Sequence, residues 1–400
     1  MPNQVDGCWP EGPDHSGPLS GVRVLDFSRI LAGPYATMQL ADLGADVIKV
    51  EAPGRGDETR HWGPPFTSDG TASYFLAVNH GKRSIELDLS DPGDAAIALA
   101  LAAEADIVID NFLPGRMERF GLDRASLAHA NPLVVTATIS GYGRGNEYSD
   151  RPGFDFLAQA FGGLMSITGP LDSSPSKVGV AVTDLLAGSL CATGVLAAFS
   201  ATRLGQPGRH IEVSLLDAQV SMLANIASGY LVSGVDPSRF GNQHPSIAPY
   251  ETLRTADREI AVAVGTDRQF QLLADVLGMP ELAADARFAT NRDRVSNRPA
   301  LVAALEAVLV TRSSDDCLTA LIAAGVPAAP VNSVAEALDD PVVRERMLTD
   351  AHGVPLVRTP IRVDGQPADV AGPPPQLGAH SAEIREHVTS RLARQEQGEP

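Results

Sequence analysis

Short apolar, β-branched runs alternate with helix-like stretches from residue 21 to residue 140, and no other feature constrains the fold as much. The runs are GVRVLDF (21–27), ADVIKVE (45–51), RSIELDL (83–89), ADIVIDNF (105–112) and LVVTATIS (133–140). Strands separated by helices build βαβ units, in which the strands run parallel. The sequence therefore predicts an α/β fold around a parallel, doubly wound sheet.

A change in composition near residues 235–250 indicates a domain boundary. The segment VDPSRFGNQHPSIAPY is rich in Pro, Gly, Asn and His, and the hairpin pattern YETLRTADREIAVAVG overlaps its end. We predict a large domain that begins with residues 18–225, a smaller inserted α+β domain at 240–325, and a C-terminal segment, 326–392, that returns to the large domain. We expect residues 1–17 and 393–400 to be disordered.

The charge and the apolar pattern argue against two classes of partner. A net charge of -18 opposes general nucleic-acid binding, because affinity for phosphates comes from Lys and Arg. The longest apolar run, at 190–201, is shorter than the roughly 20 residues that cross a bilayer. The N-terminus has no basic start followed by an apolar stretch. We expect a cytoplasmic protein that binds neither nucleic acid nor membrane.

Metal and redox cofactors are also disfavoured. The histidines show no metal-ligand spacing, and Cys8, Cys191 and Cys317 form no C-x-x-C pair. The first predicted strand is followed by SRILAGPYAT, which lacks the G-x-G-x-x-G fingerprint of nicotinamide enzymes. We therefore expect no metal and no redox cofactor, and a dehydrogenase is a weak alternative.

Asp184 lies where the extended run VGVAV gives way to the helical pattern TDLLAGSLCATGVLAA. A helix N-terminus favours an ionised carboxylate, which is the form that a nucleophile needs. An N-cap aspartate without a catalytic role would occupy the same place. Spacing alone leaves both interpretations open.

Basic residues gather in the loops of the first domain of this acidic chain. They are Arg55, Arg60, Lys82, Arg83, Arg116 and Arg119. The group is either a phosphate-binding surface or a set of solvated surface charges around turns.

The opening block LSGVRVLDFSRILAGPYATMQLADLGADVIKVEAPGRGDETR resembles the start of the family III CoA-transferases, the CaiB/BaiF group. Later blocks match the same family in order: KRSIELDL, NFLPGRMERFGL, ISGYG, RPGFDFLAQAFGGLMSITG, VGVAVTDLLAG and LGAHSAEI. The resemblance covers about residues 18–390. It implies a Rossmann-like large domain completed by C-terminal residues, a smaller inserted domain, and an interlocked homodimer.

The resemblance also implies a reaction. The family's nucleophilic aspartate falls on Asp184, whose carboxylate would attack an acyl-CoA thioester and pass through an anhydride and an aspartyl-CoA thioester. CoA would then go to a free carboxylic acid, as a co-substrate that needs no other cofactor. The segment around His244 resembles members that use succinyl-CoA and dicarboxylates. His244 itself is either a ligand of a substrate carboxylate or a structural residue.

Other family positions predict contacts with CoA. The segments and the arginine that contact the nucleotide fall on Leu87, Asp88, Leu89, Ser90, Asn111, Phe112, Leu113, Pro114, Gly115 and Arg119. Backbone and guanidinium donors suit phosphate oxygens. Two further contacts of formyl-CoA transferase fall on Leu31 and Ala52, so we expect Arg55 to substitute. Asp155 matches an acidic position beside the active site, and a buried capping carboxylate is the alternative role.

Two rival functions remain. An α-methylacyl-CoA racemase of the same family exchanges an α-proton with a His and an Asp, but the histidine position holds Phe154, which cannot transfer a proton. A CoA-binding protein without activity is the alternative from another class. The intact block around Asp184 argues against it.

Overall fold

The computed structural model describes residues 7–12, 16–351, 353–368 and 370–397. Contacts divide the chain into two units, and each is compact in itself. The first comprises Met1–Leu164, Val178–Val232 and Pro341–Pro400, and the second comprises Met165–Lys177 and Ser233–Asp340. The second unit is thus inserted into the first, and the predicted return of the C-terminal segment is seen.

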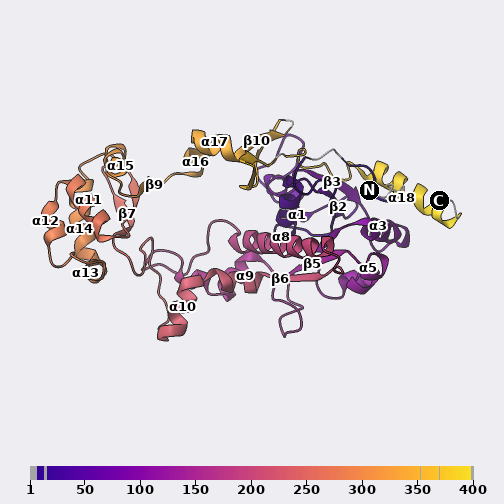
Figure 1. Ribbon diagram of the computed structural model, residues 1–400, viewed down its shortest axis with the longest axis horizontal. Helices are drawn as coiled ribbons and strands as arrows, with labels where there is room; N and C mark the ends of the chain where they lie inside the picture. Colours follow the sequence, from indigo (N-terminus) through magenta and orange to yellow (C-terminus); the bar gives the residue numbers. More distant parts are fainter. Residues whose placement is uncertain (1–6, 13–15, 352, 369, 398–400) are drawn as a thin grey trace. The chain divides into compact units, whose positions relative to one another are not determined.

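A six-stranded sheet forms the centre of the first unit, in the order β3-β2-β1-β4-β5-β6, with every neighbouring pair parallel (Figure 1). The strands are β1 (Arg23–Asp26), β2 (Asp46–Glu51), β3 (Lys82–Glu86), β4 (Ile107–Asp110), β5 (Val135–Ser140) and β6 (His210–Ser214). The α/β prediction is confirmed. Because the chain builds outward from β1 in one direction and then from β4 in the other, the carboxyl ends of these two strands flank the switch point where such sheets bind ligands.

Alternate strand residues enter two separate cores, as the period of two requires. Val24 of β1 packs with α1 (Ala32–Asp42) and α8 (Val182–Arg203) on one face, whereas Leu25 packs with α3 (Pro92–Glu104) and α18 (Ser381–Glu396) on the other. The sequence encodes α3 locally, because Asp91 caps the backbone N–H groups of Gly93 and Asp94. Both faces are covered, and this explains the nearly continuous burial of the strands.

Among the described helices, α8 is by itself long and apolar enough to cross a membrane, and α9 (Leu215–Met222) with α10 (Ala224–Ser233) would pass together but for a 72° bend. One face of α8 is buried against α1, β5 and β6. Helix α8 is therefore a core helix of the first unit, and it contains the apolar run at 190–201.

The first unit also contains short elements around the sheet. They are η1 (Glu58–His61), α2 (Ser73–Leu76), α4 (Arg116–Arg119), α5 (Arg124–Ala130), α6 (Asp155–Phe161), α17 (Pro341–Met347), the hairpin β10 (Leu348–Ala351) and β11 (Val354–Val357), and the pair β12 (Arg362–Val363) and β13 (Gln366–Pro367). The single turn α7 (Leu164–Ile167) crosses the chain boundary between the units.

The second unit is α+β, as predicted, with an antiparallel sheet β7-β8-β9. Its elements are β7 (Tyr250–Arg254), β8 (Glu259–Ala263), α11 (Asp267–Leu277), α12 (Pro280–Ala284), α13 (Asn291–Ser296), α14 (Arg298–Leu309), α15 (Ser314–Ala323), β9 (Ala328–Pro330) and α16 (Val334–Asp339). The hairpin prediction is confirmed. The expected boundary at residue 326 is wrong, because β9 pairs with β8 and keeps the chain in this unit until Pro341.

The expected disorder of the termini is corrected where the structure describes them. Cys8 and Trp9 are buried against the α3 side of the sheet, and the Trp9 indole Nε1 donates to an Asp46 oxygen at 2.7 Å. At the other end, α18 continues to Glu396. The rest of this prediction, at residues 1–6, 13–15 and 398–400, lies outside the described residues.

Candidate active site

Asp184 lies in the first turn of α8, almost fully buried, and it lines a cavity of about 90 Å³. The other lining residues come from segments that follow β1 and β4, from the end of β5 and from the start of α6: residues 29–32, 111–114, 139–141, 149, 153, 154 and 215. The carboxyl ends of three parallel strands therefore converge on one carboxylate. This is the position that open α/β sheets use for ligands.

Two close backbone approaches shape this cavity. Gly141 and Gly153 touch, because a Cβ added to either would lie within 2.5 Å of the other's Cα. Gly188, one turn beyond Asp184, lets α8 approach the start of α1, where an added Cβ would lie 2.5 Å from the carbonyl oxygen of Ala32. Small residues thus fix how near Asp184 lies to the loop that follows β1.

Electrostatics at Asp184 differ from the prediction of a carboxylate stabilised by the helix N-terminus. Burial, together with the nearby charge of Asp155, raises the pKa of Asp184 to about 7. The N-cap is Ala181, and Asp155 accepts the backbone N–H of Thr183 at 2.9 Å. Asp155 therefore takes the hydrogen bond that was expected for Asp184, and desolvation dominates at the nucleophile.

Asp155 combines both roles that the sequence left open. Its second carboxylate oxygen accepts from Gln159 Nε2, within α6, at 2.7 Å. Because its other oxygen accepts from Thr183 of α8, Asp155 links α6 to the start of α8. The Thr183 hydroxyl in turn donates to Gln219 Oε1 at 2.6 Å. Asp155 is thus a capping carboxylate whose negative charge also acts on Asp184.

A second cavity of the first unit, of about 310 Å³, adjoins the first through shared walls. Its lining is Phe27, Arg29, Val50, Glu51, Ala52, Pro53, Leu87, Asp88, Leu89, Ser90, Phe112, Arg116 and Phe120. Arg29 and Phe112 also line the cavity at Asp184. The two cavities are therefore neighbours that share part of their lining.

The structure brings together most of the residues predicted from the resemblance. Leu87–Ser90 line the second cavity, residues 111–114 line the first, and Phe112 lines both. Gly115 is the N-cap of α4 with φ 80°, and Arg119 lies in the last turn of that helix. Gly115, Arg119 and Arg55 line neither cavity.

His244 belongs to the second unit. It lines a cavity of about 810 Å³ in that unit, where its Nδ1 accepts from the Ser246 N–H and its ring contacts Tyr250. These contacts fit a structural role of His244, and its role towards a substrate carboxylate stays a prediction.

Arg29 is a site residue that sequence reasoning missed. Its backbone N–H donates to Asn111 Oδ1 at 3.0 Å, and Asn111 Nδ2 donates to the carbonyl oxygen of Arg29 at 2.7 Å. The guanidinium lies over the Phe112 ring at 5.0 Å and pairs with Glu58 at 2.9 Å. The sequence did offer one indication of this role. Arg29 follows the first predicted strand directly, and ligands of open α/β sheets bind at the carboxyl ends of the strands.

The arrangement can bind an extended anionic ligand and attack it with one carboxylate. Within the described ranges, no cluster of three or more His, Cys, Asp or Glu side chains has the geometry of a metal site.

Comparison with known proteins matches this geometry. The family described as CoA-transferase family III matches residues 19–381. The succinate–glutarate CoA-transferase of Agrobacterium fabrum is 42% identical over 93% of this chain and 96% of that protein. The acetyl-CoA:oxalate CoA-transferase of Acetobacter aceti is 38% identical over 94% of this chain and 97% of its own. A crystal structure of a CaiB/BaiF family protein from Brucella suis, 44% identical, superimposes with a TM-score of 0.85 and covers 93% of this chain and 99% of that one.

Proposed function

The chain belongs to CoA-transferase family III, and from this premise we propose that it moves CoA from succinyl-CoA, or a similar acyl-CoA, to a free dicarboxylic acid such as glutarate. The observation that carries the proposal is the almost fully buried carboxylate of Asp184, in a cavity that shares Arg29 and Phe112 with the cavity lined by predicted nucleotide contacts. The names of the relatives, which pair CoA esters with glutarate and oxalate, support the substrate class.

The proposed reaction has four steps, each an acyl substitution. The ionised carboxylate of Asp184 attacks the thioester carbonyl of the donor, which gives a mixed anhydride and releases CoA thiolate. The thiolate attacks the aspartyl carbonyl, so an aspartyl-CoA thioester forms and the donor acid leaves. The acceptor carboxylate attacks this thioester and displaces the thiolate, which then attacks the acceptor carbonyl of the second anhydride. The new acyl-CoA leaves and Asp184 is regenerated.

Burial of Asp184 suits this chemistry. The Asp184 carboxylate is almost fully buried and its pKa is raised by desolvation, so its charge is less stabilised before attack than in solution. The same burial keeps water away from the anhydride and the thioester, which water would hydrolyse. The elevated pKa of Asp184 means that the reactive form accumulates as the pH rises through about 7.

We propose that the CoA nucleotide occupies the second cavity. The backbone of Leu87–Ser90 and the guanidinium groups of Arg29 and Arg116 are placed to meet phosphate oxygens. The aromatic rings of Phe112 and Phe120 offer faces for the adenine. Arg55 and Arg119 also remain predicted contacts of the nucleotide, but the case for them is weaker because neither lines this cavity.

Racemase chemistry is not favoured. Phe154 lines the cavity in the place where the racemase needs its histidine, and a phenyl ring cannot accept a proton. The acid–base pair is therefore incomplete.

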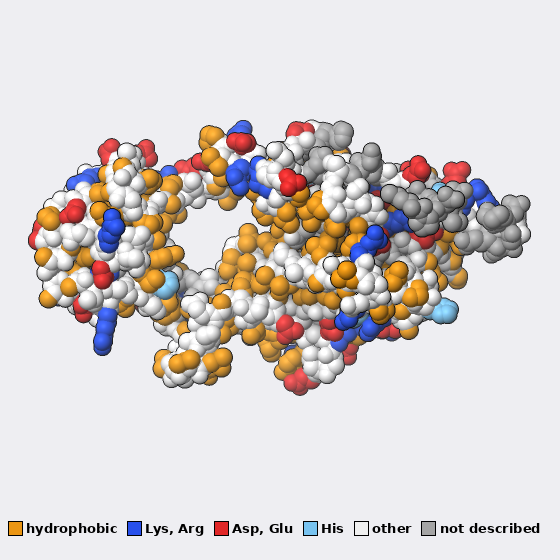
Figure 2. Space-filling view, in the orientation of Figure 1, with side chains coloured by type: hydrophobic (Ala, Val, Ile, Leu, Met, Phe, Trp, Pro, Cys, Tyr) orange, Lys and Arg blue, Asp and Glu red, His pale blue; other side chains and the backbone are white. Residues whose placement is uncertain are grey.

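We also propose a homodimer. Apolar side chains of α10 are exposed on one unit of this chain, with Leu231 at 81% and Val232 at 90% exposure, and they form an orange patch at the lower edge of Figure 2. An apolar helix of this kind is costly to leave in water and is typical of an interface. A second copy of the chain would cover this apolar surface.

We also propose that the protein is cytoplasmic and that it needs neither a metal nor a redox cofactor.

The test is a product assay with a donor and acceptor panel. Succinyl-CoA and glutarate are incubated with the protein, and we expect glutaryl-CoA by liquid chromatography and mass spectrometry. An Asp184→Ala variant should form none. Absence of every acyl-CoA product, together with deuterium exchange into a branched acyl-CoA, would refute the transferase in favour of the racemase, and CoA binding alone would indicate a non-catalytic protein.

A further inference from the structure

The loop between β1 and α1 (residues 27–31) has an unusual backbone conformation beside the nucleophile. Ile30 has φ 72°, in the left-handed region that β-branched residues rarely adopt. Arg29, Ile30 and Leu31 all line the cavity that contains Asp184. Backbone conformations of this kind persist only where the surroundings enforce them, and they gather at functional sites.

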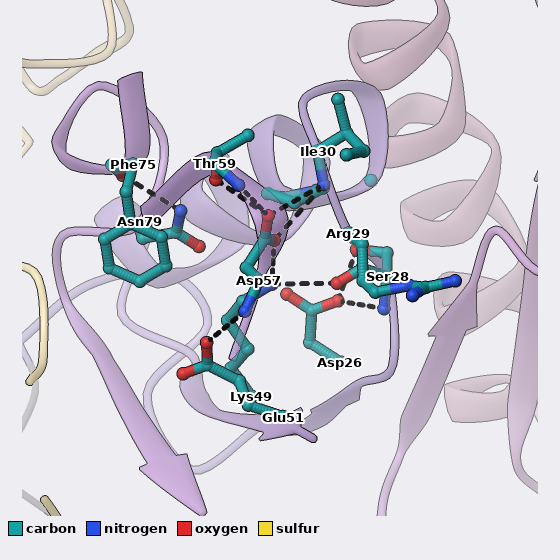
Figure 3. A network of polar contacts seen from close by, with 12 residues as sticks. Asp26, Ser28, Arg29, Ile30, Lys49, Glu51, Asp57, Thr59, Phe75 and Asn79 are labelled. Atoms are coloured by element: carbon teal, nitrogen blue, oxygen red, sulfur yellow. Dashed lines mark hydrogen bonds and ion pairs between the residues drawn. The ribbon is translucent and has the colours of Figure 1, made fainter. Parts of the chain in front are cut away.

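A buried ion pair beneath the loop enforces this conformation (Figure 3). The Asp57 carboxylate accepts the backbone N–H of Ile30 at 3.2 Å, and Lys49 Nζ donates to the carbonyl oxygen of Ser28 at 2.8 Å. The two side chains pair with each other at 3.0 Å, and both are fully buried. The Lys49–Asp57 pair therefore holds the backbone on both sides of Arg29.

A second buried pair fixes the ends of the same segment. Asp26 accepts from the Ser28 N–H at 2.9 Å and pairs with Lys82 at 3.2 Å. Lys82 Nζ also donates to the carbonyl oxygen of Pro34 at 2.9 Å. Buried charged side chains thus contact the backbone of this segment at Ser28, at Ile30 and, in the first turn of α1, at Pro34.

The loop also contacts the turn that carries the nucleophile. Ile30 and Leu31 belong to a small apolar cluster with Ala181 and Leu185, which flank Asp184 on α8. A change in the backbone at Ile30 would therefore move the wall of the cavity and its packing against the helix of the nucleophile.

Stability alone does not explain charges in this position. Buried ion pairs contribute little net stability compared with apolar residues of similar size, because both charges lose their hydration. What such a pair supplies is a defined geometry for the groups that it contacts. Here those groups are the backbone atoms of the loop that faces Asp184.

We propose that the Lys49–Asp57 pair is a positioning device that holds Arg29, Ile30 and Leu31 in the conformation required for CoA transfer at Asp184. Neither side chain lines the cavity, so they act through the loop. The inference rests on the proposed function for its kinetic test, and it carries a second test that needs no activity.

The first experiment compares two isosteric variants in the full-length chain. Asp57→Asn removes the charge that anchors Ile30, and we expect kcat to fall about 10- to 100-fold, since small misplacements at a reacting centre have effects of this size. The control is Asp42→Asn. Asp42 is equally buried, pairs with His80 at the far end of α1, and does not contact the loop. We expect Asp42→Asn to lower the melting temperature at nearly unchanged kcat.

The second experiment tests the route through Ile30. Glycine adopts a positive φ without strain, whereas alanine does not. Adding Ile30→Gly to Asp57→Asn should restore kcat several-fold, and adding Ile30→Ala should not. Equal effects of the two second substitutions would overturn the proposal, as would a kcat for Asp57→Asn that matches the Asp42→Asn control.

Amide hydrogen exchange provides the readout that needs no activity. In Asp57→Asn, the Ile30 amide should exchange at least about tenfold faster than in the unmodified chain, because its acceptor is weakened. In Asp42→Asn it should be unchanged. If the unmodified chain transfers no CoA, the proposed function fails but this measurement still decides the inference, and an unchanged Ile30 amide in Asp57→Asn would refute it.

Discussion

Replacing buried Asp184 by its uncharged isostere should make the protein more stable above about pH 4, and the gain should be largest at neutral to alkaline pH. The pKa of Asp184 is raised from 3.8 to about 7, first by burial and then by Asp155. A carboxyl with a raised pKa in the folded state binds its proton more tightly there than in the unfolded chain. Folding is therefore favoured while the group is protonated, and this advantage is lost as the pH rises from about 4 to about 7.

The size of the effect follows from the same pKa values. At 1.36 kcal/mol for each pKa unit, the folded state loses about 4 kcal/mol once the pH exceeds both values. Asp184→Asn avoids this loss, because the amide never ionises. The difference in unfolding free energy between the variant and the unmodified chain should thus grow by about 2 kcal/mol from pH 5.5 to pH 8.5.

Urea unfolding of both proteins across this pH range measures the difference. The difference should be smallest at pH 5.5, because the carboxyl of the folded protein is still mostly protonated there. A difference that stays constant with pH, or a variant that is less stable at pH 8.5, would refute the claim that Asp184 is held in a desolvated site. A stability gain paired with loss of transfer is the expected trade between function and stability.

Three further changes test the site. Gly188→Ala places a Cβ against the start of α1, so we expect kcat to fall about 10- to 100-fold in a folded protein, measured by steady-state kinetics. Arg29→Ala should raise the KM for the acyl-CoA at least about tenfold, and more than Arg55→Ala does, because Arg29 lines both cavities. Asp155→Asn should shift the acidic limb of the pH profile of kcat/KM to lower pH, because removing a like charge lowers the pKa of Asp184.

Each of these changes has a control or a contradicting result. Gly372→Ala adds a Cβ that meets no atom within 4 Å and should leave kcat unchanged. Equal KM values for Arg29→Ala and Arg55→Ala would contradict the path between the two cavities. A pH profile that does not move in Asp155→Asn would mean that its charge does not act on the nucleophile.

The order of strands β1 to β5 was predictable from the sequence because these strands are buried almost along their whole length, with both faces covered. Burial on two sides requires uninterrupted apolar runs, and those runs are visible without a structure. The boundary at residue 326 was not predictable in this way. The strand Ala328–Pro330 is short and contains a proline, so only its pairing with β8 reveals that it belongs to the inserted unit.

The site was predictable only in part. Asp184 and the segments after β3 and β4 were found through a family resemblance, and the structure places them around two adjoining cavities. The raised pKa of Asp184 was not expected, because a helix position does not tell which carboxylate takes the free N–H. That carboxylate is Asp155, which lies far back in the sequence on another helix.

The buried pair under the β1–α1 loop was also invisible in the sequence. Lys49 and Asp57 read as ordinary charges near a strand and a turn, and neither matched a motif. Their proposed positioning role depends on the positive φ of Ile30 and on its contact with Asp57, and both are visible only in the folded structure. Such conflicts between local preference and the final fold are expected at functional sites.

Intact-protein mass spectrometry tests the central claim most directly. The protein is incubated with succinyl-CoA without an acceptor, and Asp184→Asn is treated in parallel. We predict an adduct of CoA mass on the unmodified chain that maps to Asp184 and disappears with hydroxylamine, and no adduct on the variant. Glutaryl-CoA formation without any Asp184 adduct, or an equal adduct on Asp184→Asn, would contradict the account.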